Sequence, residues 1–227
     1  MTKLLKFTVL LLTAILIMTG CANDRNTNEN PAGGEGNKNL NDKNMSTEKV
    51  NVEPIISMRD YFPPDGSRGH FSGEGNKFAT YDIEVMQPHK DYFVLFEDNG
   101  GTITRRIYKV QEDRIDILDT NVVGIIEKNF PSLHELDSME SSGIYLQQPF
   151  SIGTMFDEWT IMETGLTVET PYQTFDNVFV IESKEKGAVN RKYFASGFGE
   201  IKRESAMKTG DGEIVTITSR LDALGTE

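Results

Sequence analysis

The chain has a single cysteine, Cys21, and its surroundings decide what chemistry its thiol can take part in. Lys3 and Lys6 place positive charge at the start, residues 7–18 form an apolar run, and the residues after Cys21 turn polar at once. This order is typical of a secretory signal that ends in a lipid-attachment residue. Spanning ~30 Å of hydrocarbon takes about 20 apolar residues, so an uncleaved transmembrane helix is the weaker alternative. An ordinary signal peptide that releases a soluble protein is the other alternative.

Residues Ile17-Met18-Thr19-Gly20-Cys21 resemble the lipobox of bacterial lipoproteins, with Met18 where leucine is most common. The resemblance implies that a diacylglyceryl group is attached to the sulfur of Cys21, and that residues 1–20 are then removed as a signal peptide. Cys21 would become an N-terminus with two or three acyl chains, each contributing about 0.8 kcal/mol per buried methylene. We therefore expect a lipoprotein anchored to the cell membrane on its extracytoplasmic side. Cys21 would then not be available for a disulfide, a metal or nucleophilic attack.

The other residue types that could carry a reaction lack the spacing that the reaction needs. His70, His89 and His134 share no His-x-x-x-His or His-x-x-Glu spacing, which disfavours a metal site. Ser196 lies in Ala-Ser-Gly-Phe-Gly and lacks the first glycine of the nucleophile elbow. Residues 73–75, Gly-Glu-Gly, lack the third glycine and the following helix of a nucleotide-binding loop. The sequence thus predicts no catalytic residue, no metal and no cofactor.

Asp157 and Glu158, beside the only tryptophan, Trp159, are the carboxylate pair that glycoside hydrolysis would use. We expect them on a strand over residues 157–163, where adjacent side chains point to opposite faces and could not flank one glycosidic bond. The turns at residues 98–100 and 211–213 have too few acidic side chains for a calcium loop. An envelope hydrolase is therefore the third of three functional hypotheses.

The balance of charge limits the partners. The chain has 23 Lys and Arg against 35 Asp and Glu, a formal net charge of −12 that becomes −14 if Lys3 and Lys6 are removed with the signal. Binding of nucleic acid requires phosphate neutralisation and is disfavoured. The same charge should keep the folded part away from an anionic membrane surface or a wall rich in teichoic acid.

Composition divides the chain into three parts: a lipoprotein signal peptide at 1–20, a tether at 21–50 and a β-rich extracytoplasmic domain at 51–227. The tether is rich in Asn and Gly and holds few large apolar side chains. Such a segment cannot bury enough surface to offset the entropy of ordering it, so we expect disorder. The domain is long enough for one well-buried core.

Alternation with a period of two dominates the domain and predicts strands. The hairpin signal is clearest at Asp98-Asn99-Gly100-Gly101, whose residues tolerate positive φ. Ser132 and Glu135 form a capping-box pattern that predicts one short helix. The expected strands cover residues 77–86, 92–97, 102–110, 114–119, 144–148, 157–163, 166–170, 174–183, 191–194, 199–204 and 213–221. We expect a mainly β fold with an antiparallel sheet, formed either as two similar halves or as an open half-barrel.

Two further parts of the chain carry a resemblance, the second of them in two pieces. Residues 71–81, Phe-Ser-Gly-Glu-Gly-Asn-Lys-Phe-Ala-Thr-Tyr, look like a stretch near the start of the folded part of lipoproteins from Gram-positive bacteria. Residues 170–178 and 192–202 are similar to a pattern in exported bacterial β-sheet proteins, with Gln173 where those often have glycine. The resemblance implies an exported β-sheet protein and is silent on activity. For the glycines in 73–75, 197 and 199, backbone geometry is the first interpretation.

These observations favour a non-enzymatic binding or assembly module of the cell envelope, whose ligand or protein partner the sequence does not identify. The alternative is a carrier that holds a lipid or another apolar ligand in a curved sheet. Phe175, Phe179 and Ile181 could line such a sheet, although core packing also accounts for them.

Overall fold

The computed structural model describes residues 56–226. They form one twelve-stranded antiparallel sheet with one short α-helix and one 3-10 helix, which confirms the mainly β fold with a short helix. The strands are β1 (Ser67–Glu74), β2 (Tyr81–His89), β3 (Tyr92–Asp98), β4 (Ile103–Val110), β5 (Arg114–Val123), β6 (Gly143–Gln147), β7 (Met155–Phe156), β8 (Trp159–Glu169), β9 (Thr174–Glu185), β10 (Ala188–Ala195), β11 (Gly199–Lys208) and β12 (Ile214–Thr226). The 3-10 helix is η1 (Met58–Tyr61) and the α-helix is α1 (Leu133–Ser138).

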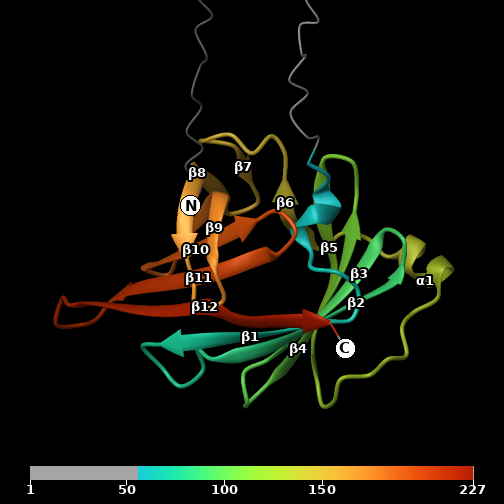
Figure 1. Cartoon of the computed structure of the whole chain (residues 1–227), viewed down its shortest axis with the longest axis horizontal. Coiled ribbons are helices and arrows are strands. Elements are labelled where there is room, and N and C mark those ends of the chain that lie inside the picture. The colour runs from blue at the N-terminus through green and yellow to red at the C-terminus, as the bar shows by residue number, and fades with distance from the viewer. Residues whose placement is uncertain (1–55, 227) are drawn as a thin grey trace, which may run out of the picture. The chain divides into compact units, whose positions relative to one another are not determined.

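The sheet consists of two meanders that share one joint. Strands β1 to β6 and β7 to β12 each pair in chain order, and β12 pairs with β1 to join the two halves (Figure 1). The terminal strands β6 and β7 approach each other at a seam, where Asp157 Oδ2 accepts a hydrogen bond from the Ile144 N–H at 2.7 Å. The sheet therefore closes almost into a barrel. It is made of two halves and is open at one seam, so it combines the two expected arrangements.

The apolar part of the interior is packed with aromatic rings from both halves. Phe62, which follows η1, stacks on Phe93 of β3 with ring centroids 4.3 Å apart. Phe179 of β9 stacks on Phe194 of β10 at 5.2 Å, and Tyr61 meets the edge of Phe179 at 5.3 Å. Such pairs add to the free energy gained by burying the rings. One end of the barrel is thus filled by η1 and its neighbours.

Glycine allows η1 to enter this closely. Gly199 has φ +73°, and a Cβ there would lie 2.5 Å from the carbonyl oxygen of Tyr61. The neighbouring Gly197 donates its N–H to the Asp60 carbonyl at 2.5 Å. The backbone interpretation of these glycines is therefore confirmed for Gly199 by a direct backbone approach.

Helix α1 covers the outer face of the first half (Figure 1). Ser132 and Glu135 form the expected capping box. Leu136 is fully buried in a cluster with Tyr92 and Val94, and the Tyr92 hydroxyl donates to Asp137 at 2.5 Å. A polar contact and an apolar contact together hold the helix against β3.

Two expected strands begin in the wrong place. Residues 77–80 precede β2, because the Asn76 side chain accepts from the Phe78 N–H at 2.7 Å and closes a turn there. Gly73 of β1 packs against that turn, since a Cβ on it would lie 2.2 Å from the Ala79 carbonyl carbon. Residues 157 and 158 form the turn between β7 and β8, with Asp157 at φ 46°. The rest of the two expected strands, residues 159–163 and 166–169, belongs to one bulged strand, β8, which starts at Trp159 and ends at Glu169.

Candidate functional site

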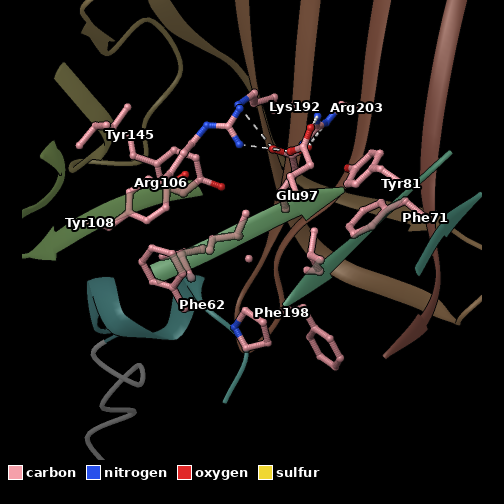
Figure 2. Close-up of a pocket in the computed structure, with 17 residues that line it drawn as sticks. Phe62, Phe71, Tyr81, Glu97, Arg106, Tyr108, Tyr145, Lys192, Phe198 and Arg203 are labelled. Atoms are coloured by element: carbon pink, nitrogen blue, oxygen red, sulfur yellow. Dashed lines mark hydrogen bonds and ion pairs between the residues drawn. The ribbon is translucent and has the colours of Figure 1, made fainter. Parts of the chain in front are cut away.

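An ion network lies inside the barrel, and its central member is Glu97 of β3. Arg203 of β11 donates from both terminal nitrogens to the two oxygens of Glu97, each at 3.0 Å. Arg106 of β4 adds a contact of 3.3 Å to the same carboxylate (Figure 2). A bidentate arginine–carboxylate pair is among the stronger polar contacts in proteins. This one connects the first half of the sheet to the second across the interior.

Two further side chains complete the network. Glu200 of β11 accepts from Arg203 Nε at 2.5 Å and lies 3.5 Å from Lys192 Nζ of β10. The ion network of Glu97, Arg106, Lys192, Glu200 and Arg203 therefore has three cations and two anions. These five are the charged residues that line the inner cavity beside η1, and among themselves they leave one positive charge uncompensated.

Aromatic rings surround the cations. The Arg203 guanidinium lies over the Tyr81 ring at 4.3 Å, and Lys192 Nζ lies 5.5 Å from the Tyr145 ring and 5.2 Å from the Trp159 ring. A cation over an aromatic face is stabilised by the ring quadrupole. Burial raises the pKa of the Tyr108 and Tyr145 hydroxyls, so both stay neutral beside the charges.

The charges of the network hold one another ionised. Burial raises the pKa of Glu97, but Arg203 and Arg106 outweigh it and the pKa falls to about 2. Burial likewise opposes ionisation of Glu200, and Arg203 and Lys192 nevertheless keep its pKa low. Burial lowers the pKa of Lys192, which Glu200 partly offsets. Neither carboxylate can therefore take up a proton near neutral pH.

Strand register places these side chains in layers. Lys192 pairs with Arg203 across β10 and β11, and Arg203 pairs with Ser219 of β12. Two residues along, Asn190 pairs with Ser183 on one side and with Ser205 on the other. Because residues directly opposite each other share a face of the sheet, the interior has a charged layer followed by a layer of small polar side chains. The Ser205 hydroxyl donates to Asn190 Oδ1 at 2.8 Å within that layer.

Two cavities meet at the network. The inner cavity, between η1 and the ion network, has a volume of about 80 Å³, enough for a few water molecules. The open cavity has a volume of about 370 Å³, within the range of small-molecule sites. Both are lined by Tyr81, Arg106, Lys192 and Arg203. The open cavity is lined in addition by Trp159, Ser183, Asn190 and Ser205.

The residues considered from the sequence are not brought together. His70 pairs with Asp82 at 2.7 Å, His89 meets the edge of the Tyr92 ring, and His134 lies exposed on α1. Ser196 is exposed in the turn before β11. Among residues 56–226, no group of three or more His, Cys, Asp or Glu side chains has the arrangement of a metal site. The predicted lipidation site Cys21, the predicted signal peptide and the predicted tether lie outside the described residues.

Asp157 and Glu158 occupy a turn, so the expectation that they point to opposite faces of a strand was wrong. Asp157 binds the backbone of β6, whereas Glu158 lies exposed at the rim of the open cavity next to Trp159. The two carboxylates thus have separate surroundings. Trp159 lines the open cavity, a position that its sequence neighbours do not reveal.

Sequence reasoning missed the ion network entirely. One signal was present: Glu97 continues the alternation of Phe93 and Leu95, and Arg106 precedes Tyr108 by two residues, so both charges occupy inward positions of their strands. A charge at an inward position needs a partner. The alternation does not reveal which strand supplies it.

Within residues 56–226, neither helix has the length or the apolar composition needed to cross a bilayer.

No protein-family model matches the chain, and no curated protein matches it in sequence. Several solved structures are similar to part of it, among them the following two. One is a candidate exported protein with a YmcC-like fold from Bacteroides fragilis NCTC 9343, at 11% identity and a TM-score of 0.45 over 75% of this chain and 100% of that chain. The other is a candidate lipoprotein from Parabacteroides distasonis ATCC 8503, at 13% identity and a TM-score of 0.43 over 76% of this chain and 100% of that chain.

Proposed function

We propose that the protein is a lipid-anchored module of the cell envelope that binds a small molecule without transforming it. The anchor is Cys21, and the binding site is the open cavity. The observation that carries the proposal is this cavity of about 370 Å³, whose charged base is held in place by the ion network. Preorganised polar groups in a concave site are what specific binding requires.

The charged groups at the base favour binding over acid–base catalysis. A general base should have a pKa near the working pH. Glu97 has a pKa of about 2 and is held by two arginines, and Glu200 also has a lowered pKa. Both carboxylates therefore serve to fix the arginines and Lys192 in position.

The geometry favours a polar ligand over the apolar ligand of a lipid carrier. The apolar part of the interior is occupied by stacked rings and leaves an inner cavity of about 80 Å³, whereas ligand sites typically exceed about 300 Å³. The larger cavity ends on arginine and lysine side chains. An apolar chain placed there would have to desolvate those charges without pairing them.

Lipid anchoring is tested by the substitution Cys21→Ser. Without the sulfur no diacylglyceryl group can be attached, so we expect the variant to leave the membrane fraction while the wild type stays with it. Radiolabelled palmitate should enter the wild type only. Continued association of the exported variant with membranes would contradict the anchor.

Ligand binding is tested by native mass spectrometry of the full chain, extracted from membranes in a non-ionic detergent. A small molecule that copurifies and dissociates on activation supports a binding module. A copurifying phospholipid would favour the carrier instead. The proposal would be contradicted if the protein is repeatedly isolated without a ligand and if no soluble envelope component added to it forms a complex in the mass spectrum.

A further inference from the structure

The cations of the ion network face the open cavity more than its anions do. Arg106, Lys192 and Arg203 line the open cavity, whereas Glu97 and Glu200 do not. The three cationic side chains are 29%, 27% and 31% exposed, and the two carboxylate side chains are 14% and 9% exposed. A molecule in the open cavity therefore meets the cationic groups first. It also meets the one positive charge that the network leaves uncompensated.

No carboxylate at the rim of the open cavity is held where it could neutralise this positive charge. Glu204 pairs with Lys202 at 2.8 Å, Glu185 pairs with Lys186 at 2.8 Å, and Arg191 pairs with Glu182 at 2.9 Å. These rim charges are therefore directed to neighbours outside the cavity lining. Glu158 is exposed at the rim, where water screens its charge.

We propose that the open cavity binds a small organic monoanion through its carboxylate, which lies at Arg106 and Lys192. The proposal rests on the proposed function and specifies the class of its ligand. A carboxylate suits these groups because charge-assisted hydrogen bonds are about twice as strong as neutral ones. Binding also neutralises the uncompensated charge at the base of the cavity.

The rest of the cavity defines the body of the ligand. Ser183, Asn190 and Ser205 offer hydroxyl and amide groups on one wall, and Trp159 offers an aromatic face beside Lys192. Such a combination fits a small ring that has hydroxyl groups on its edge and C–H groups on its face. An acidic monosaccharide has this chemistry, and the cavity volume of about 370 Å³ is suited to one small molecule.

The overall charge of −12 does not oppose this site. Charges separated by more than about 8 Å are largely screened at physiological ionic strength. The local arrangement of cations therefore dominates at the base of the cavity, and the net charge mainly slows the approach of an anion.

Trp159 gives a direct readout, because it is the only tryptophan in the chain and lines the cavity. The full chain in non-ionic detergent is titrated with glucuronate, glucose and acetate, and the tryptophan fluorescence is followed. Glucuronate and glucose share a ring and differ in a carboxylate against a hydroxymethyl group. We expect saturable binding of glucuronate, weaker binding of acetate, and at least tenfold weaker binding of glucose. Calorimetry on the same samples detects binding of a ligand that does not change the Trp159 fluorescence.

Neighbouring arginines of β4 provide matched variants. Arg106→Gln removes a cation of the cavity, whereas Arg105→Gln removes one on the opposite face that pairs with Asp119 at 2.7 Å. We expect Arg106→Gln to weaken glucuronate binding about tenfold or more, since a hydrogen bond to a charged group contributes about 1.5–3 kcal/mol. Arg105→Gln should leave it unchanged. Glu158→Gln should change binding by less than about twofold, because water screens this exposed charge at the rim.

The carboxylate proposal is overturned if neither glucuronate nor acetate binds at millimolar concentration, or if glucose binds as tightly as glucuronate. It is also overturned if Arg105→Gln and Arg106→Gln weaken binding equally while both variants remain folded. A neutral or apolar molecule that copurifies in native mass spectrometry would leave the binding module standing and refute the anion. The two proposals can thus fail separately.

Discussion

At the scale of single residues, Glu97 illustrates how the interior tolerates charge. Its carboxylate is mostly buried, and it keeps its charge because two arginines from different strands donate to it. An isolated buried carboxylate would protonate instead. Buried ion pairs of this kind contribute little to stability relative to apolar side chains, so their value lies in fixing the position of charged groups.

The lowered pKa of Glu97 predicts loss of stability in acid. The carboxyl protonates near 4.5 in the unfolded chain and near 2 in the folded chain. Its contribution, about 3 kcal/mol, is therefore fully present above pH 4.5 and lost as the pH falls towards 2. Glu97→Gln should be less stable than the wild type at neutral pH, and the difference should shrink by about 2 kcal/mol at pH 3. Urea unfolding at both pH values measures it.

An exposed acid is the control for this pH dependence. The Glu74 side chain is 72% exposed and pairs with Arg220 on the surface. Glu74→Gln should show the same change in stability between neutral pH and pH 3 as the wild type. A Glu97→Gln variant that parallels the wild type across this range would show that Glu97 is not held ionised by the arginines.

At the scale of elements, the position of η1 depends on a glycine. Gly199 has positive φ and no room for a Cβ beside the Tyr61 carbonyl, whereas Gly197 has φ +83° and open space around it. Gly197→Ala should cost about 1–2 kcal/mol from backbone strain alone. Gly199→Ala should cost clearly more, because η1 must also move away from β11.

Thermal unfolding compares the two glycine variants, and hydrogen exchange at residues 58–62 locates the effect. Faster exchange in Gly199→Ala and native exchange in Gly197→Ala are expected. Equal losses of stability in the two variants would mean that contact with the Tyr61 carbonyl does not restrict this position. The same comparison tests whether η1 is held to the barrel mainly by the turn before β11.

Local sequence signals predicted the elements whose geometry is local. The hairpin between β3 and β4 follows from Asp98-Asn99-Gly100-Gly101, where Asn99 Oδ1 accepts from the Thr102 N–H at 2.9 Å. Strand β1 escaped prediction because its sequence, Ser-Arg-Gly-His-Phe-Ser-Gly-Glu, has two glycines and little apolar alternation. β1 is stabilised by pairing with β2 and β12. The local sequence of β1 does not show that these partner strands exist.

At the scale of the whole molecule, the site depends on contacts that the sequence separates widely. Glu97 and Arg203 are 106 residues apart and come from different halves of the sheet. Alternation indicates that each side chain faces inwards, but the partner follows only from the curvature that brings β3 opposite β11. The open cavity could not be predicted for the same reason, because its lining comes from both halves.

The two halves are joined along β1 and β12, at the seam of β6 and β7, and through Glu97 and Arg203. The ion pair of Glu97 and Arg203 predicts that substitutions of these two residues have strongly coupled effects on the free energy of unfolding in a double-mutant cycle. Glu97→Leu alone should cost about 3–5 kcal/mol, because it leaves Arg203 and Arg106 without their main acceptor. Arg203→Met alone should also be costly, since Glu97 and Glu200 lose their shared donor.

The double variant Glu97→Leu with Arg203→Met should be more stable than the sum of the two losses predicts, by at least about 1 kcal/mol. Each substitution removes the charge that the other leaves uncompensated, and the apolar replacements can pack against Tyr81 and Leu95 in the same space. Strictly additive losses would mean that the ion pair does not join the two halves. Unfolding in urea, with equal slopes for all four proteins, gives the coupling energy directly.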